Sequence, residues 1–249
     1  MNVYISPPFG SRINLKGTIS ILGSFTPEPR KGLVKQTFKT LRHTKKGWVN
    51  KIGLRNPGIR NTTFNSTSVI SLVSVQDNWE EFLDIVPSRQ KIELNLSCPN
   101  VHRYSIDSST LGQITTKYDW VMGKLSPNGD IFDQCKFLLN HNVRRIHMSN
   151  AIAVDQGGLS GREVKKFNMR YIPQIQKEFP ELEIIGGGGI YYPQDVFEYA
   201  SLGIGSISLS TVFFTPWRLR KVLKVAKILE TVAAHDVKSI NVIRERYFK

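Results

Sequence analysis

The sequence predicts a single (β/α)8 barrel domain. Short β-branched runs alternate with amphipathic stretches from residue 67 onward, eight candidate strands can be counted, and polar or glycine-rich segments follow most of them. Repeated β-then-α order implies parallel strands joined by right-handed crossovers, and eight such strands favour a closed barrel over an open sheet. The chain has 249 residues and 40% hydrophobic content, enough for one substantial core. No linker, repeat or low-complexity tract divides it, so we expect one domain over residues 1–249.

The first two expected strands lie close together near the N-terminus. They are VYISP (3–7) and GTISILG (17–23), with only about ten residues between them. That gap is too short for an outer helix, because a crossover between parallel strands normally takes a dozen or more residues. We therefore expect a lean barrel whose first crossover helix is missing or reduced to a turn.

The other six strands are expected to alternate with helices. The strands are TSVISLVSV (67–75), KIELNLS (91–97), DWVMGKL (119–125), VRRIHMS (143–149), LEIIGG (182–187) and SISLS (206–210). The helices cover residues 78–86, 130–140, 162–178 and 193–202, followed by a long basic helix from about Pro216. Between residues 97 and 119 we expect an irregular polar stretch.

Charge is distributed unevenly along the chain. The 34 basic and 20 acidic residues leave a net charge of +14, and the segment from Arg30 to Lys51 contains eight cations and no acid. The tail from Trp217 to Lys249 is also basic. Such patches attract nucleic acid or acidic proteins through a screened force, but they are equally typical of a solvated face. A polyanionic partner on this surface therefore remains open.

Composition disfavours several other classes of protein. The chain has two cysteines, Cys98 and Cys135, with no CxxC pair, so neither a disulfide framework nor a zinc site is expected. No apolar run approaches the ~18 residues that span a bilayer, and the N-terminal residues do not begin a signal peptide. We expect a soluble intracellular protein, cytoplasmic and without a membrane partner. The sequence leaves its oligomeric state open.

Three glycine- or hydroxyl-rich segments stand where a barrel places its functional groups, after the carboxyl ends of strands. They are GGLSG (157–161), GGGGI (186–190) and the pair Ser210 and Thr211. Glycines allow backbone N–H groups to approach an anion closely, and a following helix N-terminus adds partial positive charge. Together these segments predict a phosphate clamp for a cofactor.

Seven motifs, in order, resemble the dihydroorotate dehydrogenase family of flavin barrels. They are GSFTPEPRKG (23–32), GWVNKIGLRNPGI (47–59), ELNLSCPN (93–100), GKLSPN (123–128), GGLSG (157–161), IIGGGGI (184–190) and QDVFEYASLGIGSISLST (194–211). The resemblance covers nearly the whole chain and implies the (β/α)8 barrel already expected. It also implies FMN as cofactor and the oxidation of dihydroorotate to orotate in pyrimidine biosynthesis.

The resemblance implies roles for particular residues. Cys98 matches the active-site base, which removes a proton from substrate C5 while hydride from C6 passes to flavin N5; a cysteine there marks the soluble class. A thiol can act as a base once it is shielded from bulk water, although a lone cysteine is also a common inert core residue. The substrate site is matched by Asn50, Gly53, Leu54, Asn95, Asn100 and Asn150. The FMN site is matched by Ser24, Lys124, Ser149, Gly158, Gly161, Gly188, Gly189, Ser210 and Thr211.

Some positions depart from the family pattern. The soluble class carries a lysine where Gly23 stands, and the membrane class places its lysine near Ser11, beside Arg12 in this chain. The stretch from Val101 to Asp119 is short for a segment that closes over substrate. These departures and the charge keep open a catalytically impaired flavin barrel that serves as a basic structural subunit of a nucleoprotein particle or virion. A tRNA dihydrouridine synthase is a third alternative, which the asparagine set disfavours.

Overall fold

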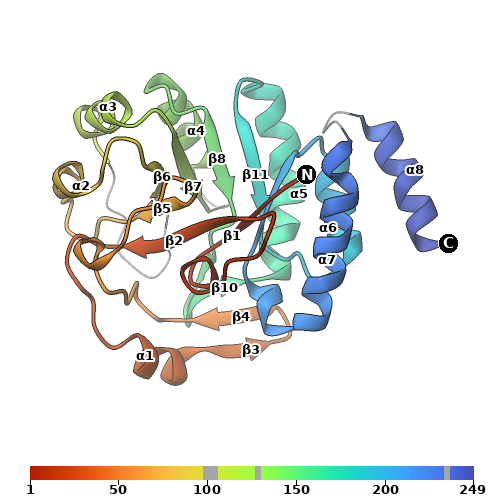
Figure 1. Ribbon diagram of the computed structural model, residues 1–249, viewed down its shortest axis with the longest axis horizontal. Coiled ribbons are helices and arrows are strands. Elements are labelled where there is room, and N and C mark those ends of the chain that lie inside the picture. Colours follow the sequence, from red (N-terminus) through yellow and green to blue (C-terminus); the bar gives the residue numbers. More distant parts are fainter. Residues whose placement is uncertain (98–105, 127–129, 233–235) are drawn as a thin grey trace.

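The centre of the molecule is a closed barrel of eight parallel strands (Figure 1). The computed structural model describes residues 1–97, 106–126, 130–232 and 236–249. Around the barrel the strand order is β1-β12-β11-β8-β7-β6-β5-β2. The strands are β1 (Asn2–Ile5), β2 (Ile19–Phe25), β5 (Val69–Leu72), β6 (Lys91–Asn95), β7 (Val121–Leu125), β8 (Arg145–Met148), β11 (Glu183–Gly187) and β12 (Ser206–Leu209). Each lies within or overlaps a strand expected from the sequence, so the predicted barrel is confirmed.

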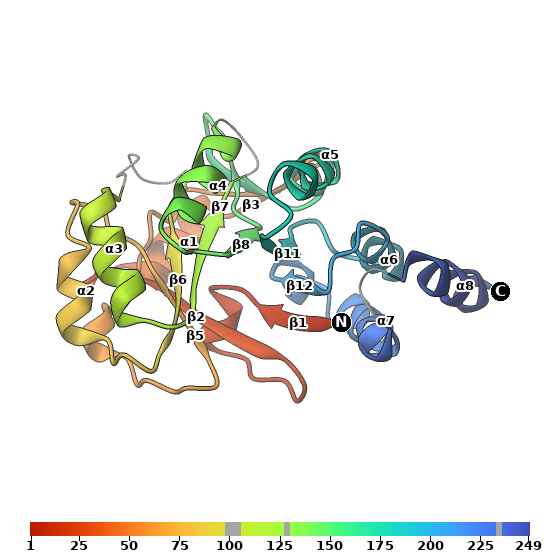
Figure 2. The same cartoon turned by 90° about the horizontal axis from the view of Figure 1, so that it is seen from above.

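Helices surround the barrel from β5 onward (Figure 2). They are α2 (Glu80–Ile85), α3 (Ser108–Lys117), α4 (Ile131–Asn140), α5 (Arg162–Glu178), α6 (Pro193–Ser201) and α7 (Pro216–Ile228). The crossover from β1 to β2 contains only a 3-10 turn, η1 (Phe9–Ser11), as the short spacing predicted. Further 3-10 turns are η2 (Ile59–Asn61), η3 (Thr211–Phe214) and η4 (Leu229–Thr231).

One expectation was wrong, and another was incomplete. The stretch expected to be irregular contains α3, which begins where the Asp107 carboxylate accepts a hydrogen bond from Thr110 N at 2.9 Å and which buries Leu111 and Ile114. Only two apolar residues face the core there, so its helical period is weak in the sequence. The helix that starts at Pro216 stops at Ile228, and a separate helix, α8 (Val237–Phe248), packs against α6.

A second, antiparallel sheet lies at the carboxyl end of the barrel and was not predicted (Figure 1). Its order is β3-β4-β10-β9, with bounds Arg42–Thr44, Gly47–Asn50, Gly157–Ser160 and Ile152–Val154. The segment 157–160, expected as part of a glycine-rich loop, is therefore a strand. A Cβ at Gly157 would lie 2.2 Å from the carbonyl oxygen of Asn50, so glycine permits this close pairing. The short helix α1 (Leu33–Thr40) precedes β3.

The barrel interior is layered. Its apolar layer consists of Tyr4, Ile21, Val69, Met122 and Ile185, which form a cluster separate from the main core between strands and helices. Side chains two residues further along a strand face the same way. On β5 and β7 those next positions are the buried polar residues Ser71 and Lys124. A polar layer therefore lies above an apolar plug, on the side of the carboxyl ends.

Candidate functional site

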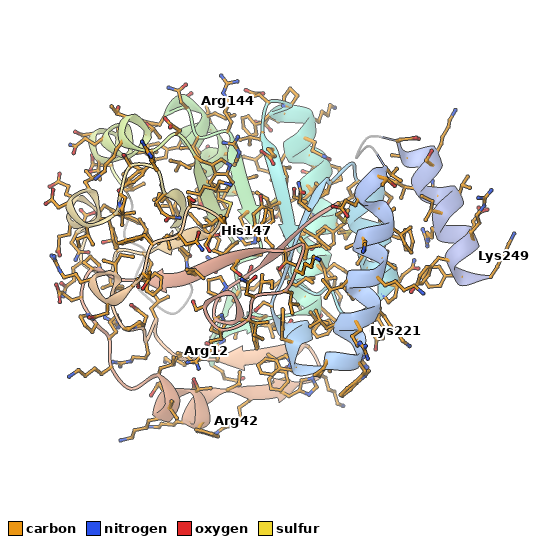
Figure 3. The ribbon with its side chains drawn as sticks, viewed as in Figure 1. Arg12, Arg42, Arg144, His147, Lys221 and Lys249 are labelled. Carbon is orange, nitrogen blue, oxygen red and sulfur yellow. The ribbon has the colours of Figure 1, made fainter. Side chains whose placement is uncertain are left out.

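A cavity of about 490 Å³ opens at the carboxyl ends of the barrel strands. The strand ends and the segment after β11 line its inner part, and α1, β4 and η3 line its mouth. Arg12 is among the lining residues and, like Arg42, lies toward the side of the small sheet, whereas His147 lies near the centre of the barrel (Figure 3). The cavity is where barrel proteins place their chemistry.

The cavity brings together most of the predicted site residues. Those that line it are Ser24, Asn50, Leu54, Asn95, Lys124, Ser149, Asn150, Gly161, Gly188, Gly189, Ser210 and Thr211. Gly53 and Gly158 do not line it: the Gly53 carbonyl accepts a hydrogen bond from Arg30 Nε at 3.2 Å, and Gly158 pairs with Asn50 in the small sheet. Cys98 and Asn100 lie outside the described residues. The individual roles of all these residues stay predictions.

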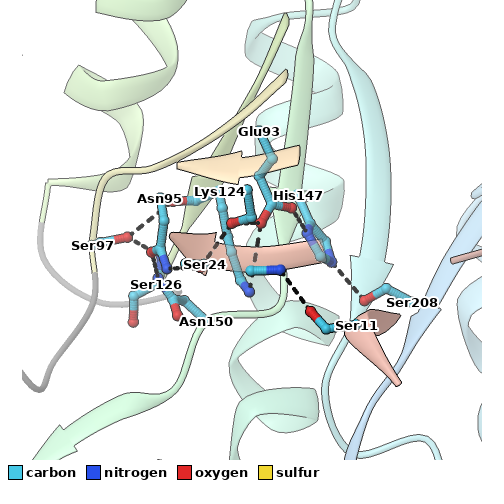
Figure 4. A network of polar contacts seen from close by, with 12 residues as sticks. Ser11, Ser24, Glu93, Asn95, Ser97, Lys124, Ser126, His147, Asn150 and Ser208 are labelled. Atoms are coloured by element: carbon cyan, nitrogen blue, oxygen red, sulfur yellow. Dashed lines mark hydrogen bonds and ion pairs between the residues drawn. The ribbon is translucent and has the colours of Figure 1, made fainter. Parts of the chain in front are cut away.

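A continuous chain of hydrogen bonds runs from the cavity into the barrel (Figure 4). Asn150 Nδ2 donates to Asn95 Oδ1 at 2.8 Å, and Asn95 Nδ2 donates to Ser24 Oγ at 3.0 Å. The Ser24 and Ser71 hydroxyls lie 2.7 Å apart, and Ser71 Oγ donates to Glu93 Oε1 at 2.7 Å. The two asparagines at the cavity floor are thus connected to one buried carboxylate.

Two further groups contact the same carboxylate. His147 Nδ1 lies 2.6 Å from Glu93 Oε2, and its Nε2 lies 2.6 Å from Ser208 Oγ. Lys124 Nζ lies 3.8 Å from Glu93 Oε1, with the lysine side chain 8% exposed. Strand register explains the gathering, because Ser71 pairs with Glu93 and Lys124 pairs with His147.

The charges in this cluster follow from its contacts. Burial by itself would raise the pKa of Glu93, but the Lys124 charge and hydrogen bonds from His147 and Ser71 outweigh burial and lower the pKa to about 2. Burial lowers the pKa of His147, although Glu93 opposes that shift. We therefore assign an ionised Glu93 and a neutral His147 that donates from Nδ1 to the carboxylate and accepts from Ser208. Lys124 brings a positive charge to the cavity floor.

The far end of the cavity is a glycine cradle beside the N-terminus of α5. A Cβ at Gly188 would lie 2.4 Å from Val164 Cγ1, and one at Gly189 would lie 2.9 Å from the Gly161 carbonyl oxygen. Both glycines have positive φ, 83° and 73°, which other residues rarely adopt. Only residues without a side chain allow the backbone to pass this close to the helix.

The buried amide of Asn168, on α5, holds the strands beneath this cradle in place. Its Nδ2 donates to the carbonyl oxygens of Met148 and Gly187, at 2.7 and 2.6 Å, at the ends of β8 and β11. The Tyr199 hydroxyl also donates to the Gly187 carbonyl oxygen, at 2.8 Å. The position of the cradle is therefore fixed by hydrogen bonds from α5 and α6.

The lining fits a flat ring that carries an anionic tail. The buried Ser149 Oγ faces no hydrogen-bond partner among the described residues, as expected of a polar atom reserved for a ligand. The mouth carries aromatic rings, with Trp48 and Phe214 at a centroid separation of 4.4 Å. On α1, Val34 and Phe38 line the mouth yet are 65% and 81% exposed. FMN has these parts, and the residues present fit it.

Sequence reasoning missed Glu93, His147, Ser71 and Ser208. A usable signal was present: KIEL and RRIHM place a charged or ionisable residue inside an otherwise apolar strand, on the inward-facing period. Such a residue has to find a partner within the barrel. Its partners come from other strands, and sequence alone does not pair them.

Comparison with known proteins agrees with the geometry. The family model for dihydroorotate dehydrogenase matches residues 10–230. The chain belongs to the dihydroorotate dehydrogenase family. Family membership makes it an oxidoreductase, and confirms the resemblance seen in the motifs.

Relatives of known name are similar over most of the chain. "Dihydroorotate dehydrogenase B (NAD(+)), catalytic subunit" of Shouchella clausii is 29% identical over 240 residues, which covers 82% of this chain and 77% of the relative. "Dihydroorotate dehydrogenase A (fumarate)" of Lactiplantibacillus plantarum is 26% identical over 234 residues, covering 78% and 75%. The ligand-free DHODH of Eimeria tenella has the same fold, with a TM-score of 0.71 at 16% identity over 96% of this chain and 87% of that one.

Proposed function

We propose that the protein oxidises dihydroorotate to orotate with FMN as cofactor. The observation that carries the proposal is that three asparagines and a lysine share one cavity with a glycine cradle. Asn95, Asn150 and Lys124 line its inner part, Asn50 lines its mouth from β4, and Gly188 and Gly189 line its far end. FMN, when bound, supplies the acceptor for hydride.

The asparagines are suited to the substrate. A side-chain amide offers a donor and an acceptor side by side, as the ring amides and carboxylate of dihydroorotate require. Asn95 and Asn150 are buried and hydrogen-bonded to each other, so their amides are already fixed before a ligand arrives. Preorganised groups of this kind lower the cost of binding.

Lys124 is suited to the cofactor ring. Its side chain is 8% exposed and lines the cavity floor, where a positive charge stabilises negative charge that develops nearby. Gly188, Gly189, Ser210 and Thr211 are placed to hold the phosphate through backbone and hydroxyl donors.

Cys98 is our proposed base. It follows β6 by three residues, and β6 contributes Asn95 to the cavity. A thiolate at that position would accept the proton from substrate carbon while hydride leaves. The other cysteine, Cys135, is buried in α4, where burial raises the pKa of its thiol to about 12.

The test is the visible spectrum of the purified protein. We expect the absorption bands of bound oxidised flavin, bleached by dihydroorotate under anaerobic conditions. Fumarate and NAD+, the acceptors named for the relatives, can then be added to the reduced protein to see which restores the bands. Bound flavin that dihydroorotate leaves oxidised would contradict the proposed activity and favour the catalytically impaired alternative.

A further inference from the structure

Glu93 is the one carboxylate that contacts both the asparagine chain and the cavity lysine in the described part of the barrel. It is fully buried and does not line the cavity itself. A buried carboxylate is costly unless several groups compensate it. Here Ser71, His147 and Lys124 do so, which indicates a purpose other than simple packing.

The direction of the hydrogen-bond chain follows from this carboxylate. An ionised carboxylate can only accept hydrogen bonds, so Ser71 donates its single hydroxyl hydrogen to Glu93. Ser24 must then donate to Ser71, and Ser24 is left as acceptor for Asn95 Nδ2. The Asn95 oxygen consequently accepts from Asn150. A neutral group at position 93 would permit the reverse direction and flipped amides.

We propose that Glu93 is a positioning residue of the cavity, which holds the Lys124 ammonium group and, through Ser71 and Ser24, fixes the orientation of the Asn95 and Asn150 amides toward the ligand. The inference rests on the proposed function for the identity of that ligand. Its charge also offsets that of Lys124, so that reduced flavin meets a less positive floor than the lysine alone would provide.

The first experiment uses the FMN-loaded protein and Glu93→Gln. Glutamine is nearly isosteric: with its oxygen accepting from His147 Nδ1, its amide nitrogen faces Ser71 and can donate there, which allows the hydrogen-bond chain to reverse. Loss of the buried negative charge should raise the flavin midpoint potential by at least about 30 mV. For a two-electron reduction this corresponds to a tenfold change in the equilibrium constant. Affinity for orotate, followed by the flavin difference spectrum, should fall at least tenfold because the asparagine amides are released.

Two further variants separate charge from orientation. Glu93→Asp keeps the charge but shortens the side chain. The flavin midpoint potential should therefore change by less than about 30 mV, while the affinity for orotate falls. Glu183→Gln is the matched control: it removes one carboxylate from an exposed ion pair with Arg145 at the opposite end of the barrel, and should change neither quantity. If Glu93→Gln behaves like Glu183→Gln in both measurements, the inference is overturned.

A measurement without flavin keeps the two proposals distinguishable. In FMN-free protein, 15N NMR should find His147 neutral with its proton on Nδ1, both in the wild type and in Glu93→Gln. The Asn95 side-chain amide should resist hydrogen exchange in the wild type and lose that protection in the variant. Failure to bind FMN with these signals intact would overturn the proposed function only. A wild-type imidazolium, or an unprotected Asn95, would overturn the positioning role.

Discussion

Glu93 and His147 make the interior of the barrel sensitive to acid. The folded-state pKa of Glu93 is about 2 against an ordinary 4.5, and that of His147 is lowered from 6.5. For both groups the unfolded chain therefore binds protons at a higher pH than the folded protein does. The stability they contribute is present above these ordinary values and is lost as pH falls, below 6.5 for the histidine and from 4.5 toward 2 for the glutamate.

We accordingly expect the free energy of unfolding to fall as pH is lowered from 7 to 3. The double variant Glu93→Gln, His147→Gln removes both titrations and should show a smaller slope in urea unfolding measured across that range. Glu183→Gln, whose carboxylate is half exposed, should retain the wild-type slope. Equal slopes for the wild type and the double variant would contradict the assigned ionisation.

Cys98 and Cys135 should differ in function. Cys98→Ala should keep FMN but slow its reduction by dihydroorotate about 10²-fold or more, as removal of a general base does. Cys98→Ser should lie between the two, because serine is the weaker base. Cys135→Ala is the control and should leave the reduction rate unchanged, since that thiol is buried in α4 and held in its neutral form. Stopped-flow absorbance under anaerobic conditions measures all three, and undiminished reduction in Cys98→Ala would remove its assignment.

A substitution at Gly188 tests whether the glycine cradle binds the cofactor phosphate. Gly188→Asp introduces a Cβ within 2.4 Å of Val164, a positive-φ strain and a negative charge where the phosphate is expected. The variant should lose flavin during purification. A control, Gly112→Asp, places the same side chain on α3 where a Cβ meets nothing within 4 Å. A Gly188→Asp protein as yellow as this control would show that the phosphate binds elsewhere.

At the scale of elements, α5 secures the strands that carry the site. Asn168→Ala would leave the Met148 carbonyl without its side-chain donor, and the Gly187 carbonyl with Tyr199 alone. An unsatisfied buried group costs about 1–3 kcal/mol, so the free energy of unfolding should fall by about that amount. Gln174→Ala, an exposed position on the same helix, is the control for changes in helix propensity. Chemical denaturation that shows equal stability for the two variants would contradict this role.

The barrel elements could be predicted from sequence because each is a local pattern. A run such as TSVISLVSV indicates a buried strand by itself. The alternation of strands and helices along the chain then predicts which strands are parallel neighbours. The small sheet could not, since β4 and β10 are more than 100 residues apart and β10 is rich in glycine. The same distinction applies to the site. The asparagines at strand ends and the glycine loops could be recognised in the sequence, whereas the partners of Glu93 depend on the register between barrel strands.

For the whole molecule, the basic surface is separate from the buried cluster. In the segment from Arg30 to Lys51, the seven cations after Arg30 are all exposed, and on α7 the side chains of Arg220, Lys221, Lys224 and Lys227 are exposed as well. These charges face solvent. Among the described residues, no helix is both long and apolar enough to cross a bilayer.

A polyanion bound to this surface would be held there by screened charge, and this alternative can be tested. Retention on heparin should fall steeply with salt, as counterion release requires. Replacing Arg220, Lys221, Lys224 and Lys227 by glutamine should lower the eluting salt concentration without altering the flavin spectrum. The same number of replacements around α1, at Lys35, Lys39, Lys45 and Lys46, shows which face dominates. Elution at low salt from the wild type would contradict a polyanionic partner.

The apolar plug closes the barrel at the end opposite the cavity. Its members are Tyr4, Ile21, Val69, Met122 and Ile185. Because these packed side chains leave no passage, ligands enter and leave at the carboxyl ends of the strands. A reactant that occupies the floor blocks the way for the next one until it has gone. Two ligands that both need the floor of the cavity can therefore occupy it only one after the other.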